Sequence, residues 1–505
     1  MNLYRRIGQA VFSNTFIAPL AALFSFVGSV FVARYLSLET YGIYVIVLAI
    51  KSTSLLYSDL GMSAGASRFF PELEKKEGYI GVLRWLKGVF VTRLTLAAFS
   101  MLIIIAFREK LSSIYGLSDQ HSYLFVLVGI LIFTDSCTLT IQSYLRANLE
   151  QKAINLVDLA FSIIKSSLII LSVILGYGLK GLLIALVVSS ALNAFFFSVL
   201  LYSRLRYVEK KLPQKSDKAE NLFKRFIKLS LSVFFIKQTS YFTSLSFIIL
   251  VMGLYFNKQE IAFFSLAAGF ANKAYNMTLM PTKGVLLPSF SFSILTGDRS
   301  KIQLSFTYSL KFVSFLIFPV SMFLICLCPI LIPMIYTEKF LPSVILLRII
   351  LFFSLFASLT YSISSELLIA GEHLRVYVFV MLLSILFVPI FFLVSQVGLV
   401  AIATFYGFVQ LSVAVALTIL VIKLFNLKFP TQHFIKMASA TITVGLVLLG
   451  IKYVLDDNII IIILSFISLL AFLPLLRLLN IFSDQDKDVI RKLGIPFNEH
   501  VVKYF

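Results

Sequence analysis

The stretch VFSNTFIAPLAALFSFVGSVFVA, residues 11–33, is predominantly apolar and carries no charged side chain. A helix that crosses the hydrocarbon core of a bilayer needs about 20 such residues, because only a helix satisfies its own backbone polar groups in lipid. The run follows Arg5 and Arg6, and it is longer than the apolar core of a secretory signal peptide. We therefore expect an uncleaved first membrane span here.

Comparable apolar runs recur along the whole chain. Hydrophobic residues make up 59% of the 505 positions and charged residues only 13%, whereas a soluble domain is closer to half apolar and a quarter charged. We predict an all-α polytopic membrane protein with about 14 transmembrane helices. The predicted spans are 10–33, 41–61, 87–107, 122–143, 154–175, 181–202, 226–253, 260–285, 304–334, 343–368, 375–395, 398–422, 434–455 and 458–479.

Lysine and arginine residues concentrate in every second loop of this arrangement, and the most basic loop runs from Arg204 to Lys228. Because cytoplasmic loops of membrane proteins carry the excess of basic residues, the alternation predicts that both chain ends are cytoplasmic. A net charge of +20 would suggest nucleic acid as the partner of a soluble protein. Here we expect the basic loops to face anionic membrane lipids, and we predict no nucleic-acid partner.

Two pairs of loop segments repeat at nearly the same offset. Tyr35–Tyr44 is similar to Tyr255–Phe264, 220 residues later, and Tyr144–Lys152 is similar to Leu367–Arg375, 223 residues later. The repeat predicts two pseudo-symmetric six-helix bundles, related by an axis along the membrane normal. The predicted domains are an N-terminal six-helix bundle (1–203), a basic cytoplasmic linker (204–225), a C-terminal six-helix bundle (226–423), two extra helices (424–482) and a cytoplasmic tail (483–505).

Six basic residues fall inside the predicted spans, where a charge at mid-bilayer costs at least about 2.5–3.5 kcal/mol. They are Lys51, Arg93, Lys165, Lys237, Lys273 and Lys311. Lys51 and Lys273 occupy the middle of corresponding helices in the two halves, so we predict that both face a central substrate cavity.

The alternative is that these cations snorkel to an interface or pair with an acidic side chain. The available partners are Asp59, Asp135, Asp158 and Glu366. We favour this alternative for Arg93 and Lys311, which lie nearer the inner ends of their spans, and leave both readings open for Lys165. Asp59, next to Gly61, is interpreted as a structural residue at a helix end.

Four short motifs resemble those of the bacterial polysaccharide-export flippases. They are Ala33–Tyr44 (ARYLSLETYGIY), Asp59–Gly61 (DLG), Ser67–Phe69 (SRF) and Leu145–Ala147 (LRA). These flippases belong to the multidrug/oligosaccharidyl-lipid/polysaccharide exporter (MOP) superfamily, and the chain most resembles its O-antigen-type flippases of lipid-linked oligosaccharides. The resemblance covers spans one to twelve. The last two spans depart from the twelve-helix core, although lipid II flippases also have fourteen.

The resemblance implies a transporter of the bacterial cytoplasmic membrane that works by alternating access. A cationic cavity would hold the pyrophosphate and sugars of the substrate, while its polyprenyl tail stays in lipid. To this cavity we assign Lys51, Lys237, Lys273, Arg34 and Arg146. A proton or sodium gradient, or the membrane potential, would drive transport, and a polysaccharide polymerase or glycosyltransferase is an expected partner. Candidates for ion coupling are the carboxylates Asp135, Asp158 and Glu366.

Two other functions stay open at this point. A multidrug/cation antiporter of the same fold would need an acidic cavity, which the excess of intramembrane lysines argues against. A membrane-bound polysaccharide polymerase usually needs a large outer loop, and the predicted outer loops are short. The sequence has no phosphate-binding Gly-Lys-Ser/Thr loop, and its cysteines and histidines lack metal-site spacing. We therefore expect no catalytic residues, no bound metal and no cofactor.

Overall fold

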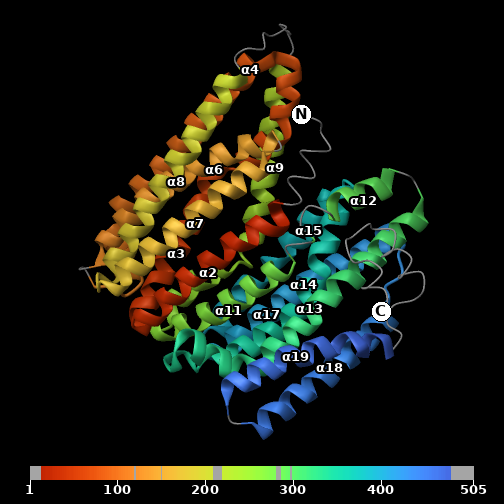
Figure 1. Ribbon diagram of the computed structural model, residues 1–505. Helices are drawn as coiled ribbons and strands as arrows, with labels where there is room; N and C mark the ends of the chain where they lie inside the picture. Colours follow the sequence, from red (N-terminus) through yellow and green to blue (C-terminus); the bar gives the residue numbers. More distant parts are fainter. Residues whose placement is uncertain are drawn as a thin grey trace. The chain divides into compact units, whose positions relative to one another are not determined.

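Every regular element in the computed structural model of the chain is a helix, within the residues that the structure describes (Figure 1). These are residues 13–118, 121–148, 150–208, 219–279, 282, 286–295, 298–455 and 457–478. The predicted all-α class is confirmed. The predicted tail, 483–505, lies outside the described residues, and so does 209–218 within the predicted linker.

The chain divides into two compact units, Met1–Ser265 and Leu266–Phe505. The predicted domain boundaries at 204–225 and 424–482 stay a prediction.

Nine consecutive α-helices lie wholly within the first unit, counted over the residues that the structure describes. Their bounds are α2 Ala18–Tyr35, α3 Leu38–Asp59, α4 Met62–Ala106, α5 Arg108–Ile114, α6 Tyr123–Ala147, α7 Gln151–Ile174, α8 Gly178–Val208, α9 Ala219–Tyr241 and α10 Leu245–Tyr255, preceded by the π-helical turn η1 Ser13–Ile17. The Ser37 side chain caps α3 by accepting a hydrogen bond of 3.2 Å from the backbone N–H of Thr40. Glu39 lies in the first turn, where the helix dipole favours a negative charge.

Eleven helices of the described chain are long and apolar enough to cross a membrane, and the number rises to twelve if one bent pair counts as a single span. That pair is α9 and α10, which meet at an angle of 46°. Each predicted span overlaps a helix or a broken helix. Most of the predicted span ends lie within a few residues of the helix ends. The protein is therefore a multi-pass membrane protein, and the count of fourteen stays a prediction.

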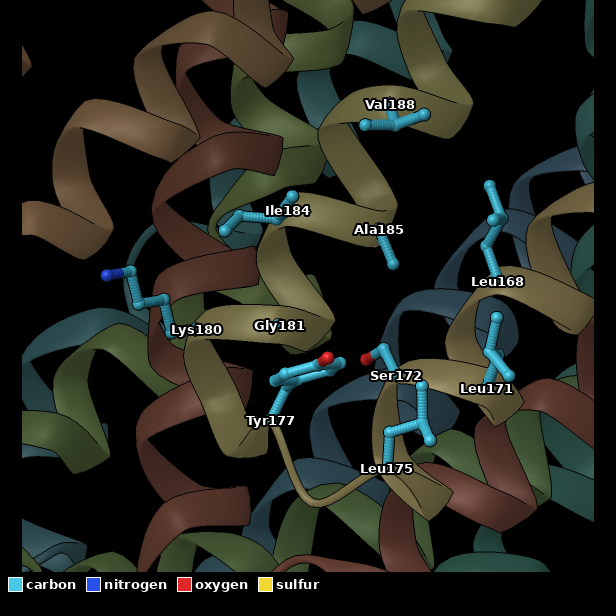
Figure 2. A pocket seen from close by; sticks show the side chains of 10 residues that line it. All are labelled: Leu168, Leu171, Ser172, Leu175, Tyr177, Lys180, Gly181, Ile184, Ala185 and Val188. Atoms are coloured by element: carbon cyan, nitrogen blue, oxygen red, sulfur yellow. The ribbon is translucent and has the colours of Figure 1, made fainter.

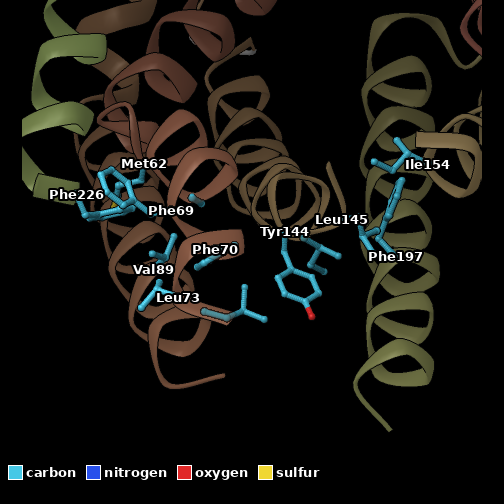
Figure 3. Close-up of a cluster of buried hydrophobic side chains, with 13 residues drawn as sticks. Met62, Phe69, Phe70, Leu73, Val89, Tyr144, Leu145, Ile154, Phe197 and Phe226 are labelled. Atoms are coloured by element: carbon cyan, nitrogen blue, oxygen red, sulfur yellow. The ribbon is translucent and has the colours of Figure 1, made fainter. Parts of the chain in front are cut away.

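Helix α4 departs most from the predicted spans. It continues without a break through Met62–Ala106, whereas the predicted third span begins at position 87. At 1.5 Å per residue its 45 residues extend about 68 Å, roughly twice the hydrocarbon thickness of a bilayer. The reason is a buried apolar cluster on its N-terminal half, where Phe69 and Phe70 pack against Tyr144 of α6 and Phe226 of α9 (Figure 3). The packing of this cluster stabilises the helical conformation of the N-terminal half of α4, outside the apolar span.

Helix α3 packs against several other helices of the first unit. Helix α6 contacts α3, α4 and α8, α2 packs on α7, and α3 also contacts α9 and α10. Gly42 permits a close approach: a Cβ there would lie 2.0 Å from the carbonyl oxygen of Lys258, at the start of α11 (Lys258–Thr278). Gly42 of the quoted motif thus has a packing role.

The second unit is built around α13, α14 and α17, and α18 and α19 pack on α13. Its elements after α11 are α12 Leu286–Leu295, α13 Arg299–Tyr336, η4 Glu338–Phe340, α14 Ser343–Ala370, α15 Leu374–Ser384, α16 Phe387–Val394, α17 Leu399–Phe425, α18 Thr431–Val454 and α19 Asn458–Leu478. The Tyr275 hydroxyl of α11 donates a hydrogen bond of 2.9 Å to the carbonyl oxygen of Leu351 and lies 2.9 Å from the Ser321 hydroxyl. These bonds join α11 to α13 and α14.

Candidate functional site

The first charged cluster joins α3 to α6. Lys51 Nζ, in the middle of α3, donates a hydrogen bond of 2.7 Å to Oδ2 of Asp135. The two side chains keep 22% and 26% of their surface exposed within the protein. In an apolar environment such a pair is strong, because charge attraction grows as the local dielectric falls. The Lys51 charge is therefore held between helices and remains accessible.

Hydroxyl groups and a second lysine complete this cluster. Ser190 on α8 donates a hydrogen bond of 2.5 Å to Oδ1 of Asp135, and the Thr134 hydroxyl lies 2.7 Å from the Ser190 oxygen. Lys165 on α7 lies close enough to interact electrostatically with both Lys51 and Asp135. The cluster therefore has two lysines for one carboxylate, and Lys51 is the one that is bonded to it.

The second cluster gathers two cations around Asp59, the last residue of α3. Lys237 Nζ on α9 donates a hydrogen bond of 2.8 Å to Oδ2, and Arg93 Nη2 on α4 lies 3.3 Å from Oδ1. Ser63 donates to the same Oδ1 from its backbone N–H and its hydroxyl, at 3.1 and 2.5 Å. The Arg93 side chain is 0% exposed, so protein groups rather than solvent stabilise its charge.

The turn after Asp59 depends on a glycine. Leu60 and Gly61 both adopt the left-handed conformation, with φ of 42° and 72°. A Cβ at Gly61 would lie 2.1 Å from the carbonyl oxygen of Ser230, so the turn between α3 and α4 lies directly against α9. The Asp59-Leu60-Gly61 motif therefore places the carboxylate where α3, α4 and α9 meet, and the interpretation of Asp59 as a helix-end residue is confirmed.

Two further side-chain contacts hold α9 along α3. The Tyr241 hydroxyl lies 2.5 Å from the Thr53 hydroxyl, and Gln238 donates a hydrogen bond of 2.7 Å to the Tyr57 hydroxyl. Together with the Lys237 pair, these contacts follow one face of α9 over its last turns. The seventh predicted span thus begins as part of the first unit.

A third group of hydrogen-bonded polar side chains lies where α6 ends and α7 begins, on the side predicted to face the cytoplasm. Gln142 donates a hydrogen bond of 3.2 Å to Oδ1 of Asp158 and accepts one of 3.1 Å from Arg146. A neutral amide therefore stands between this carboxylate and its cation. Asp158 is held less tightly than Asp135, whose partner is a directly bonded ammonium.

These three groups form what we term the charged network of the first unit. Its basic members are Lys51, Arg93, Arg146, Lys165 and Lys237, and its acidic members are Asp59, Asp135 and Asp158. The network therefore carries an excess of two positive charges.

A family model described as "Polysaccharide biosynthesis protein" matches residues 31–345 of the chain, which include the whole charged network. The chain belongs to this family. No curated protein sequence matches the chain.

Solved structures show that this member of the polysaccharide biosynthesis protein family has the MOP superfamily fold. A structure of the lipid II flippase MurJ in an inward closed conformation aligns with 92% of the chain and 97% of its own length, at 18% identity and a TM-score of 0.69. An inward-facing multidrug resistance MATE family transporter aligns with 84% of the chain and 94% of its own, at 15% identity and 0.57. A MOP superfamily transporter from Pyrococcus furiosus aligns with 83% and 95%, at 12% identity and 0.53.

The structure brings some of the predicted site residues together. Lys51 and Lys237 lie in the charged network, each bonded to a carboxylate. Arg146 joins the network through Gln142, and Arg34 is exposed in the last turn of α2. Lys273 lies on α11 in the second unit and is exposed. That the five cations line one cavity stays a prediction.

The predicted ion-coupling residues have different surroundings. Asp135 and Asp158 belong to the charged network. Glu366 lies in the second unit, half-buried near the end of α14, and forms no ion pair with any residue of the described chain. The described ranges also contain no group of three His, Cys, Asp or Glu side chains that could hold a metal.

The sequence identified the charged members of the network but not two polar side chains that bond to them. The preferred pairing of Arg93 is confirmed, since Asp59 is its partner. The sequence left open whether Lys165 faces the cavity or pairs with an acidic side chain. Lys165 and Lys51 lie on different helices, so the sequence could not show that they are close. Ser190 and Gln142 were missed; the only available signal was a polar side chain inside an apolar run.

Proposed function

We propose that the protein is a flippase that moves a polyprenyl-pyrophosphate-linked oligosaccharide, an O-antigen or related surface polysaccharide unit, from the inner to the outer leaflet of the bacterial cytoplasmic membrane. It works by alternating access, catalyses no chemical reaction and has both termini in the cytoplasm. The observation that carries this proposal is the excess of positive charge in the network of the first unit, in a chain of the polysaccharide biosynthesis protein family.

The pyrophosphate is the part of this substrate that the network recognises. Lys51 and Lys165 lie near a single carboxylate, Asp135, so a diphosphate that approaches them would meet more basic than acidic side chains. Attraction at that position is stronger than in water, because the surrounding helices lower the dielectric. Bound diphosphate would compete with Asp135 for the Lys51 ammonium, and Ser190 would then remain to hold the released carboxylate.

The two alternative functions find less support. A cation antiporter would need a surplus of carboxylates where the network has a surplus of cations. The MOP superfamily transporter from Pyrococcus furiosus is described as having a binding pocket of reverse polarity that suggests a different function, so pocket charge varies within this fold. A polymerase would need catalytic side chains outside the membrane, and the described segments between the helices of the first unit are short.

For energy coupling we propose a proton or sodium gradient, with Asp158 as the first carboxylate to test. Its nearest donor is the neutral amide of Gln142, whereas Asp135 is bonded directly to an ammonium. Protonation of Asp158 therefore breaks no direct ion pair. A polysaccharide polymerase or glycosyltransferase that binds the basic inner loops would deliver or receive the substrate.

The test is a lipid extraction from cells depleted of the protein, in which polyprenyl-pyrophosphate-linked sugars are quantified by mass spectrometry. We expect one such species to accumulate while the matching surface polysaccharide disappears, and restoring the native chain should reverse both changes. An unchanged lipid-linked pool would rule out the oligosaccharide substrate, and small-molecule efflux would become the next assay.

A further inference from the structure

A cavity of about 470 Å³ lies between α7 and α8, and no member of the charged network lines it. Its walls are apolar and consist of Leu168, Leu171, Leu175, Ile184, Ala185 and Val188. Figure 2 shows these side chains around one continuous space, with Leu168 and Val188 at one end and Tyr177 at the other. The wall on α7 runs from Leu168 to Leu175, about 10 Å at 1.5 Å per residue.

The end of the cavity near the α7–α8 turn is polar. Ser172 is 8% exposed, and its hydroxyl has no hydrogen-bond partner in the described part of the chain. In Figure 2 this hydroxyl and the hydroxyl of Tyr177 point into the same end of the cavity. A buried hydroxyl that lacks a partner costs free energy, so it indicates an absent ligand atom.

A cation stands at the rim of the same end. Lys180 lines the cavity, is exposed and forms no ion pair with the residues that the structure describes. In Figure 2 the Lys180 ammonium points away from the apolar walls, and it lies 5.7 Å from the centre of the Tyr123 ring. The flexible side chain has to swing over the rim before it contacts a lipid headgroup. The apolar walls suit the acyl chain of a phospholipid, and the two hydroxyls suit its ester oxygens. The ammonium of Lys180 suits its phosphate.

We propose that the cavity between α7 and α8 binds one anionic phospholipid, with an acyl chain against the apolar walls, its polar oxygens at Ser172 and Tyr177, and its phosphate at Lys180. The 10 Å of wall is about a third of the roughly 30 Å hydrocarbon thickness, which suits the upper part of one acyl chain in one leaflet. This lipid site is separate from the substrate-binding network and does not depend on the proposed flippase activity.

The test uses the full-length chain in nanodiscs that contain equal amounts of phosphatidylglycerol and phosphatidylcholine. After transfer to mild detergent, native mass spectrometry counts the lipids that the protein retains. We expect phosphatidylglycerol to be retained about fivefold more often than phosphatidylcholine, as one added basic contact allows. Equal retention of the two lipids would overturn the proposal.

Two variants fill the site, one removes the cation at its rim, and one serves as the control. Ala185→Phe occupies the apolar walls, and Ser172→Leu removes the hydroxyl and fills the polar end; either should lower the count by one lipid. Ala191→Phe adds the same ring at an exposed position of α8 that does not line the cavity, and it should change nothing. Lys180→Gln should keep the lipid and lose the preference for phosphatidylglycerol. A native lipid count in folded Ala185→Phe and Ser172→Leu proteins would refute the site.

Discussion

The ammonium of Lys51 on α3 lies 2.7 Å from a carboxylate oxygen of Asp135 on α6. The pair gives Lys51 a partner in the absence of substrate and keeps its charge between the helices. It also means that loss of Lys51 has two separable consequences: the substrate loses a cation, and Asp135 loses its partner.

Lys51→Gln should abolish transport of the lipid-linked oligosaccharide and lower the free energy of unfolding by about 1–3 kcal/mol, because Asp135 loses the ammonium that is bonded directly to it. The double variant Lys51→Gln/Asp135→Asn should recover the stability but not the transport. Accumulation of the lipid-linked species measures transport, and the melting temperature in detergent measures stability. The exposed Lys110→Gln on α5 is the control for loss of one lysine. Full transport by the double variant would remove Lys51 from the substrate site.

Asp59→Asn should be the most destabilising single substitution in the charged network. It leaves the fully buried Arg93 and the bonded Lys237 without their shared carboxylate, a loss of about 3–5 kcal/mol for a buried pair. Thermal unfolding in detergent measures the effect. The matched control is Glu72→Gln, which removes an exposed ion pair with Arg225 and should cost at most about 1 kcal/mol. Equal losses in both variants would contradict the central position of Asp59.

Gly42→Ala should destabilise the first unit by about 1–3 kcal/mol, because the new Cβ would lie 2.0 Å from the carbonyl oxygen of Lys258 and must push α3 and α11 apart. Gly88→Ala in α4 is the control, since nothing lies within 4 Å of a Cβ there. That control should be neutral or slightly stabilising, as alanine favours a helix over glycine. A melting temperature unchanged by Gly42→Ala would show that the two helix starts separate without cost.

Gly61→Ala should combine two costs. The left-handed backbone at φ 72° disfavours a side chain by about 1–2 kcal/mol, and the Cβ would lie 2.1 Å from the carbonyl oxygen of Ser230. Gly176→Ala separates these costs, because Gly176 has φ of 75° but open space around it. Unfolding midpoints should therefore fall further for Gly61→Ala than for Gly176→Ala. The opposite order would show that α9 does not lie against this turn.

The length and spacing of apolar runs determined the helices of this protein. Each predicted span has a helix at its place, and Lys51 was correctly identified as a charge in the middle of one. The Asp59-Leu60-Gly61 motif also predicted a helix end, because few residues other than glycine tolerate the left-handed turn there. These features are local, and local sequence suffices to specify them.

Which side chains meet was decided by the tertiary structure. Nothing in the sequence places Lys165 beside Lys51, Ser190 on Asp135, or Lys237 on Asp59, because these residues lie on different helices and meet only where the helices cross. The extension of α4 beyond its apolar span has the same origin, since contacts with α6 and α9 stabilise it. Apolar length sets where a chain enters and leaves the membrane, whereas packing between helices sets which charges compensate one another.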